Sequence, residues 1–116
     1  MKLELKNGIL YGTFKADSID LNIAKKIVET RLQFINGRSY PMIFQQDGLK
    51  SINKEARNYF NSDLGIKGVS AGAIIAKNVF EAHLANFFIK ISAIKVKVPT
   101  KVFKDEKEAL LWLKQF

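Results

Sequence analysis

The side chains that most often carry catalysis or bind metals are sparse in this sequence. Its 116 residues include no cysteine and one histidine, His83, which excludes disulfides, thiolate metal sites and cysteine nucleophiles. Glu81 lies two residues before His83, and residues at i and i+2 of a helix point to different faces. Because a zinc site needs at least three protein ligands, this pair does not predict a metal site.

Motifs for nucleotide chemistry are also missing. Neither G-x-x-x-x-G-K-[ST] nor G-x-G-x-x-G occurs, and these are the glycine-rich loops that cradle phosphates. We interpret three nearby glycines structurally, as a helix end at Gly65, a loop at Gly68 and close packing at Gly72. Nucleotide hydrolysis therefore has no support in the sequence.

The carboxylates near the C-terminus have a structural explanation. Asp105 and Glu108 have the spacing of a capping box at the start of a helix. Glu106 lies between them, where the helix dipole favours an anion. We therefore predict no catalytic residue, no cofactor and no bound metal, and we expect a protein that is not an enzyme.

Composition and charge indicate one small basic domain. Hydrophobic residues make up 47% of the chain and charged residues 26%, close to globular averages, so we assign residues 1–116 to a single domain. The formal net charge is +8, and sixteen of the nineteen basic residues are lysine. Base-specific contacts rely on the arginine fork. We expect no specific nucleic-acid binding, with nonspecific polyanion binding as an alternative.

One stretch of the chain concentrates positive charge. No acidic residue lies between Glu81 and Asp105, and five lysines fall in this interval: Lys90, Lys95, Lys97, Lys101 and Lys104. They have two interpretations. They belong to a solvated edge strand and its loop, where lysines discourage edge pairing, or they form a patch that binds phosphate groups.

Neither a secretion signal nor a membrane span is predicted. The first ten residues, MKLELKNGIL, lack both an apolar run and a small-residue cleavage site. The longest apolar stretch, Val79–Ile91, contains Glu81, His83, Asn86 and Lys90, whereas a membrane-spanning helix needs about 20 mostly apolar residues. We therefore expect a cytoplasmic protein.

The strands are predicted by alternation and by short apolar runs. Apolar residues alternate on both sides of Asn7-Gly8, a dipeptide that favours a tight turn, so residues 2–15 are predicted to form a β-hairpin. Three further strands are predicted at residues 40–45, 69–76 and 98–104. The second of these is nearly uncharged, which predicts a central strand buried on both faces.

Four helices are predicted by apolar residues at helical spacing. The first is capped by Ser18 or Asp20 and stops at Asn36-Gly37. The other three cover residues 53–65, 78–91 and 105–116. The resulting order, β-β-α-β-α-β-α-β-α, predicts an α/β domain with a mixed sheet, in which an antiparallel hairpin is followed by right-handed crossovers.

This order resembles the fold of the anti-sigma-factor antagonist and sulfate-transporter C-terminal (STAS) domains over nearly the whole chain. In STAS antagonists, an Asp-Ser-Ser-Gly motif opens a helix with a phosphorylatable serine. When residues 43–57 are laid on that pattern, Asn53 falls at the Asp, Lys54 at the first Ser, Glu55 at the phosphorylated Ser and Ala56 at the Gly. The sequence also resembles small bacterial STAS-like proteins that are related in fold to SEC14-like lipid-binding domains.

The departure from the STAS motif predicts that the phosphorylation switch is lost. A carboxylate such as Glu55 cannot accept a phosphate, and it places a fixed negative charge near the helix N-terminus. Ser51 is the nearest hydroxyl, and we interpret it as a capping or turn residue. The resemblance makes this segment a candidate partner surface, formed by Ser51, Asn53, Lys54, Glu55 and Arg57.

The predicted helix at residues 78–91 is apolar nearly all round. If its sheet-facing stripe contains Leu84, large apolar residues are left over on the outer side. The leftover residues form a candidate dimer or ligand surface: Phe80, Ala82, Ala85 and Ile89. An unusually buried helix is the alternative explanation.

These observations predict a STAS-like domain that works by binding. A protein partner or a homodimer is the first expectation. The apolar outer side of the helix at residues 78–91 and the candidate partner surface around Glu55 are the two places where such a partner would bind. The alternative from another class is a small apolar or lipid-like ligand, held beside the helix at residues 78–91. Nonspecific polyanion binding is the third alternative, and it depends on charge alone.

Overall fold

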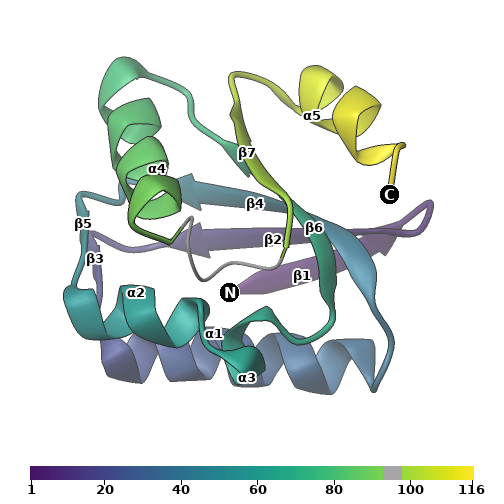
Figure 1. Ribbon diagram of the computed structural model, residues 1–116, viewed down its shortest axis with the longest axis horizontal. Coiled ribbons are helices and arrows are strands. Elements are labelled where there is room, and N and C mark those ends of the chain that lie inside the picture. Colours follow the sequence, from purple (N-terminus) through teal and green to yellow (C-terminus); the bar gives the residue numbers. More distant parts are fainter. Residues whose placement is uncertain (93–97) are drawn as a thin grey trace.

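The main sheet is mixed, and its strands lie in the order β1-β2-β4-β6-β7 (Figure 1). The computed structural model describes residues 1–92 and 98–116, and the side chains of all residues except 87–97. β1 pairs antiparallel with β2, whereas the pairs β2–β4, β4–β6 and β6–β7 are parallel. The strands are β1 (Lys2–Lys6), β2 (Ile9–Lys15), β4 (Tyr40–Asp47), β6 (Val69–Ile75) and β7 (Thr100–Phe103).

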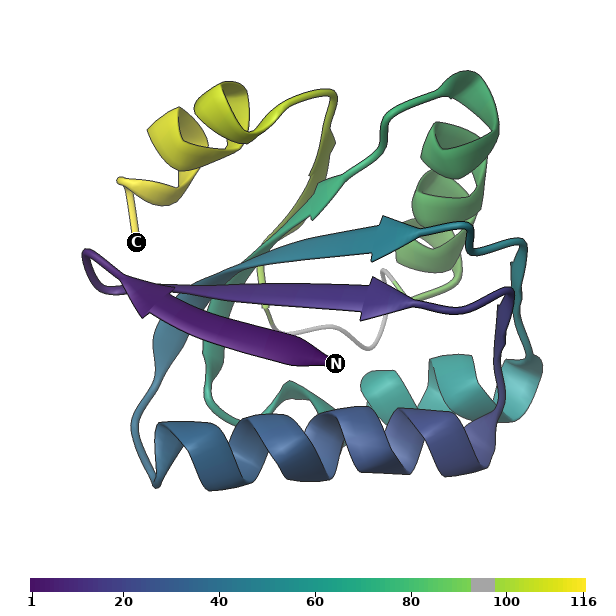
Figure 2. The ribbon, with the colours of Figure 1, turned by 180° about the vertical axis from the view of Figure 1, so that it is seen from behind.

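Residues 1–92 and 98–116 form five helices around the sheet. They are α1 (Leu21–Ile35), α2 (Lys54–Phe60), α3 (Asp63–Ile66), α4 (Val79–Ser92) and α5 (Glu106–Leu113). Figure 1 shows α4 and α5 on opposite sides of β7, and in the view from behind α1 lies below the sheet, with its axis in roughly the same direction as β2 (Figure 2). The predicted single α/β domain with a mixed sheet is confirmed, with one helix more than expected.

The hairpin turn and three helix starts form at the residues that the sequence predicted. Asn7 and Gly8 adopt φ angles of 53° and 78°, the left-handed conformation that a tight hairpin turn requires. The side chains of Asp20, Asn53 and Asp105 each accept a hydrogen bond of 2.9 Å from the backbone N–H three residues on. These bonds satisfy N–H groups that a helix start otherwise leaves unpaired.

The second predicted helix is interrupted, which corrects the interpretation of Gly65. α2 ends at Phe60, and the Ser62 hydroxyl then caps α3 by accepting a 3.1 Å hydrogen bond from the N–H of Gly65. Gly65 therefore lies inside a short helix and does not end a long one. Glycine is required at position 65 for a steric reason, because a Cβ at this position would overlap the carbonyl oxygen of Tyr59.

A second sheet was not predicted. It consists of β3 (Ser18–Ile19) and β5 (Ser51–Ile52), which pair in parallel. Two-residue strands are too short to show a period in sequence. They hold the segment before α1 against the segment before α2, and Asn53 N–H donates a 3.1 Å hydrogen bond to the Ile19 carbonyl at the same junction.

The position of β6 also differs from the prediction. β4 is the central strand, and β6 lies between β4 and the edge strand β7. β6 is still paired on both sides, and its residues Ala71 and Ala73 are fully buried. The uncharged run at residues 69–76 therefore predicted an interior strand correctly, but it did not determine the position of that strand in the sheet.

We predict that Gly65→Ala lowers the free energy of unfolding by about 1–3 kcal/mol, the usual cost of overpacking. The added methyl would meet backbone, which cannot move aside as a flexible side chain does. Gly72→Ala is the matched control, because its Cβ would lie 3.6 Å from Thr100 Oγ1, an ordinary contact. Urea denaturation measures both variants. Equal stability of the two variants would contradict the steric role of Gly65.

Candidate functional site

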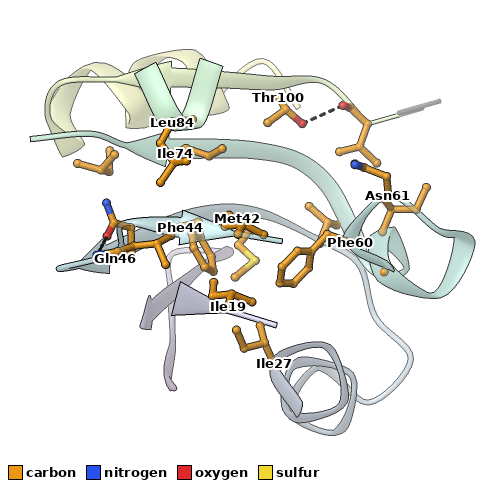
Figure 3. Close-up of a pocket in the computed structure, with 18 of the residues that line it drawn as sticks. Ile19, Ile27, Met42, Phe44, Gln46, Phe60, Asn61, Ile74, Leu84 and Thr100 are labelled. Carbon is orange, nitrogen blue, oxygen red and sulfur yellow. Dashed lines mark hydrogen bonds between the residues drawn. The ribbon is translucent and has the colours of Figure 1, made fainter. Parts of the chain in front are cut away.

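A cavity of about 170 Å³ lies between the main sheet and the helices on one of its faces. We call it the apolar cavity. Its walls come from β4 and β6 of the sheet and from α1, α2 and α4, as Figure 3 shows. The principal apolar side chains are Ile27, Met42, Phe44, Phe60, Ile74 and Leu84.

Strand alternation places the β4 residues of the cavity on one face of the sheet. Met42 and Phe44 are two residues apart on β4, so they point the same way. The register pairs Phe44 with Ile74 on β6, which adds a third large side chain to this face. Ile43, between the two β4 residues, faces the opposite side and packs with Ala109 of α5.

A buried arginine also lines the apolar cavity. Arg31 is only 4% exposed. Its Nη2 donates hydrogen bonds to the carbonyl oxygens of Gly65, at 2.7 Å, and of Lys67, at 3.2 Å. Its Nε has no hydrogen-bond partner among the described residues. Burial lowers the pKa of the Arg31 guanidinium below its ordinary value, because desolvation disfavours the charged form.

The other polar side chains of the cavity are tied to nearby backbone. Gln46 is 7% exposed, and its Oε1 accepts a 2.9 Å hydrogen bond from the N–H of Leu49. Thr100 Oγ1 donates to the Val98 carbonyl at 3.0 Å, a bond drawn in Figure 3. In Figure 3, Gln46 and Asn61 lie at opposite ends of the group of lining side chains. Polar groups therefore border an apolar middle.

The candidate partner surface at the start of α2 is brought together by the fold. Ser51, Lys54 and Glu55 are exposed there. Asn53 caps α2 through its 2.9 Å bond from Ala56 N–H, and Arg57 Nη1 donates to the Ile52 carbonyl at 2.6 Å. Two of the five residues thus have structural hydrogen bonds at the β5–α2 junction, and three present their side chains to solvent.

The candidate dimer or ligand surface on α4 is divided. Phe80 is 57% exposed, whereas Ala85 lines the apolar cavity. Ala82 is partly buried and is not among the lining residues. The side chain of Ile89 lies outside the described residues. Ala85 was predicted to share the outer side of the helix with Phe80, but it lines the cavity together with Leu84.

The remaining chemical candidates are isolated on the surface. His83 is exposed, and Lys101 and Lys104 of the lysine run are exposed as well. The side chains of the other lysines of that run, Lys90, Lys95 and Lys97, lie outside the described residues. Over residues 1–92 and 98–116, no three His, Asp or Glu side chains gather where they could hold a metal ion. No helix in this described part is long and apolar enough to cross a membrane.

Sequence reasoning did not identify Arg31, although a signal was present. Ala24, Ile27, Val28 and Ile35 form the buried stripe of α1, and Arg31 falls within it at helical spacing. A cation within an apolar stripe predicts a buried charge that needs acceptors. The acceptors on α3 are far away in sequence, so no local pattern reveals them.

Comparison with known proteins supports the fold. The model of the family described as "Domain of unknown function (DUF7793)" matches residues 3–116. A solved structure of an uncharacterised protein of the DUF3478 family with a SpoIIAA-like fold, from Shewanella loihica PV-4, is similar with a TM-score of 0.58. The two chains are 17% identical over 97% of this chain and 90% of that one. No curated protein matches this chain. The expected STAS-like fold is confirmed.

We predict that a serine kinase of the anti-sigma type adds no phosphate to the start of α2. Glu55 occupies the acceptor position of the STAS motif, and a carboxylate is not an acceptor for this transfer. Intact-mass spectrometry and peptide mapping after incubation with kinase and ATP measure the outcome. A phosphate mapped to Ser51 in the wild type, and lost in Ser51→Ala, would contradict the prediction.

Proposed function

The chain belongs to the DUF7793 family of domains of unknown function, and we propose that it binds a small, mainly apolar ligand in the apolar cavity, without catalysing a reaction. The observation that carries the proposal is the cavity itself. Its walls combine large apolar side chains with a few polar groups at the border. That combination is typical of small-molecule sites, where apolar walls supply affinity and a few polar groups supply orientation.

The size of the cavity sets the size of the ligand. An engineered apolar cavity of roughly 150 Å³ is known to bind benzene, and the apolar cavity has about 170 Å³. It therefore suits one ring or a chain of about six to eight carbons. At a ligand efficiency of about 0.6 kcal/mol per non-hydrogen atom, such a ligand binds with a dissociation constant on the order of 0.1 mM.

We predict that 1-octanol binds the wild-type protein and that Ala85→Phe weakens this binding at least about tenfold. Ala85 lines the cavity from α4, so a phenyl ring at this position occupies the space of the ligand. Ala82→Phe is the matched control, because it adds the same ring to the same helix at a residue that does not line the cavity. Isothermal titration calorimetry measures the affinities, and circular dichroism checks that both variants are folded.

Two results would contradict the proposal. The first is a wild-type protein that binds no apolar compound of this size at millimolar concentration. The second is equal weakening by both phenylalanine substitutions, because it would place the octanol at a surface of α4 and not in the cavity.

A second candidate function, interaction with a protein partner or a second copy, is supported by the outer surface of α4. Val79 is 74% exposed and Phe80 is 57% exposed, and they are neighbours at the start of the helix. Burying one such side chain contributes about 1.5–3 kcal/mol. A symmetric pairing uses such a patch twice, once from each subunit.

We predict for this second candidate that Phe80→Glu shifts the protein toward the monomer and leaves the circular dichroism spectrum unchanged. Phe34→Glu is the control, because Phe34 is similarly exposed, at 47%, but lies on α1. Sedimentation velocity over a concentration series measures the association state. A wild-type protein that stays monomeric at high concentration would exclude the homodimer.

A further inference from the structure

We propose that the ligand of the apolar cavity carries a single carboxylate, and that Arg31 is the residue that selects it. This inference rests on the proposed function and names the class of ligand, a short-chain alkyl carboxylate. It starts from a charge that the structure leaves uncompensated inside the domain. Arg31 lines the cavity while only 4% of its surface is exposed.

No carboxylate of the described residues forms an ion pair with Arg31. The ion pairs within the described residues are those of Glu4 with Lys2 and Lys6, on the surface strand β1. Glu81 also lines the cavity, but it accepts hydrogen bonds from the backbone N–H of Lys77, at 3.0 Å, and from Asn78 Nδ2, at 3.3 Å. A buried charge without a counter-charge is strongly unfavourable. An anion in the cavity would relieve this cost.

The hydrogen bonds of Arg31 fix its position but do not use its full capacity. Both bonds leave from Nη2 and end on the carbonyl oxygens of Gly65, inside α3, and of Lys67, the residue that caps the end of α3. A guanidinium has five N–H donors, and its Nε has no acceptor among the described residues. The group is therefore held in place by neutral acceptors while its charge remains available to a ligand.

The apolar lining of the cavity determines the chemistry of the ligand beyond its charged group. The cavity that Arg31 lines has mainly apolar side chains, and these include Phe44, Ile74 and Leu84. One guanidinium neutralises one negative charge, so a single carboxylate matches Arg31, whereas a phosphate dianion would bring a second charge that Arg31 does not neutralise. The arrangement thus fits a carboxylate joined to an alkyl chain of about six to eight carbons.

The test compares three probes with the same chain: octanoate, 1-octanol and octylamine. We expect the wild type to bind octanoate about 10- to 100-fold more tightly than 1-octanol, as a hydrogen bond to a charged group allows, and to bind octylamine least. Arg31→Met should remove the preference, so that this variant binds octanoate no more tightly than it binds 1-octanol. Arg38→Met is the matched control, because Arg38 is exposed and does not line the cavity.

The outcomes separate this inference from the proposed function. If octanoate and 1-octanol bind equally to the wild type, the carboxylate selection is wrong while the apolar site stands. If neither binds, both proposals are wrong. Tighter binding of octyl phosphate than of octanoate would overturn the carboxylate class. If Arg31→Met does not fold, Arg31→Lys decides, because it keeps the charge and must still prefer octanoate over 1-octanol.

Discussion

The need to cover both faces of a parallel sheet determines this structure. β2, β4, β6 and β7 pair in parallel, and such strands bury both of their faces under helices. The two faces are built from side chains of different size. On one face, Ala71 and Ala73 of β6 meet Ala109 of α5, and all three are fully buried. Small side chains allow the short α5 to lie close to the sheet.

The other face carries large side chains, and the cavity is their consequence. Met42, Phe44 and Ile74 project from the sheet toward α1, α2 and α4. α1 contacts α2, α2 contacts α4, and α4 contacts the edge strand β7, and the cavity lies between these helices and the sheet. Arg31 is anchored at this space because α3 and its C-cap residue Lys67 bring two backbone carbonyls within hydrogen-bond distance. The apolar cavity and its buried cation therefore arise from the same packing arrangement.

The parts of the fold that sequence reasoning predicted depend on neighbours along the chain. The Asn7-Gly8 turn and the caps at Asn53 and Asp105 are local signals, and each forms as expected. The β3–β5 pair joins distant segments, and its two-residue strands are too short to show a period. The break between α2 and α3 is a local feature, the cap formed by Ser62, which the apolar spacing of residues 53–65 did not reveal.

The candidate site was less predictable than the fold, for the same reason. Helical spacing identified α4 as unusually apolar, but it could not decide on which side of the helix Ala85 lies. Arg31 was visible as a cation within the buried stripe of α1, yet its acceptors, Gly65 and Lys67, lie more than thirty residues away. A cavity is a property of several elements at once, and no single segment encodes it.

The most direct measurement is an isotope-filtered nuclear Overhauser experiment on methyl-labelled protein in the presence of 1-octanol. Ligand binding in the apolar cavity predicts contacts from the octanol chain to the methyl groups of Met42, Ile74 and Leu84. It predicts none to Ile43 and Leu113, which are buried on the opposite face of the sheet. Contacts to Ile43 and Leu113, or a saturated complex without contacts to the cavity methyl groups, would contradict it.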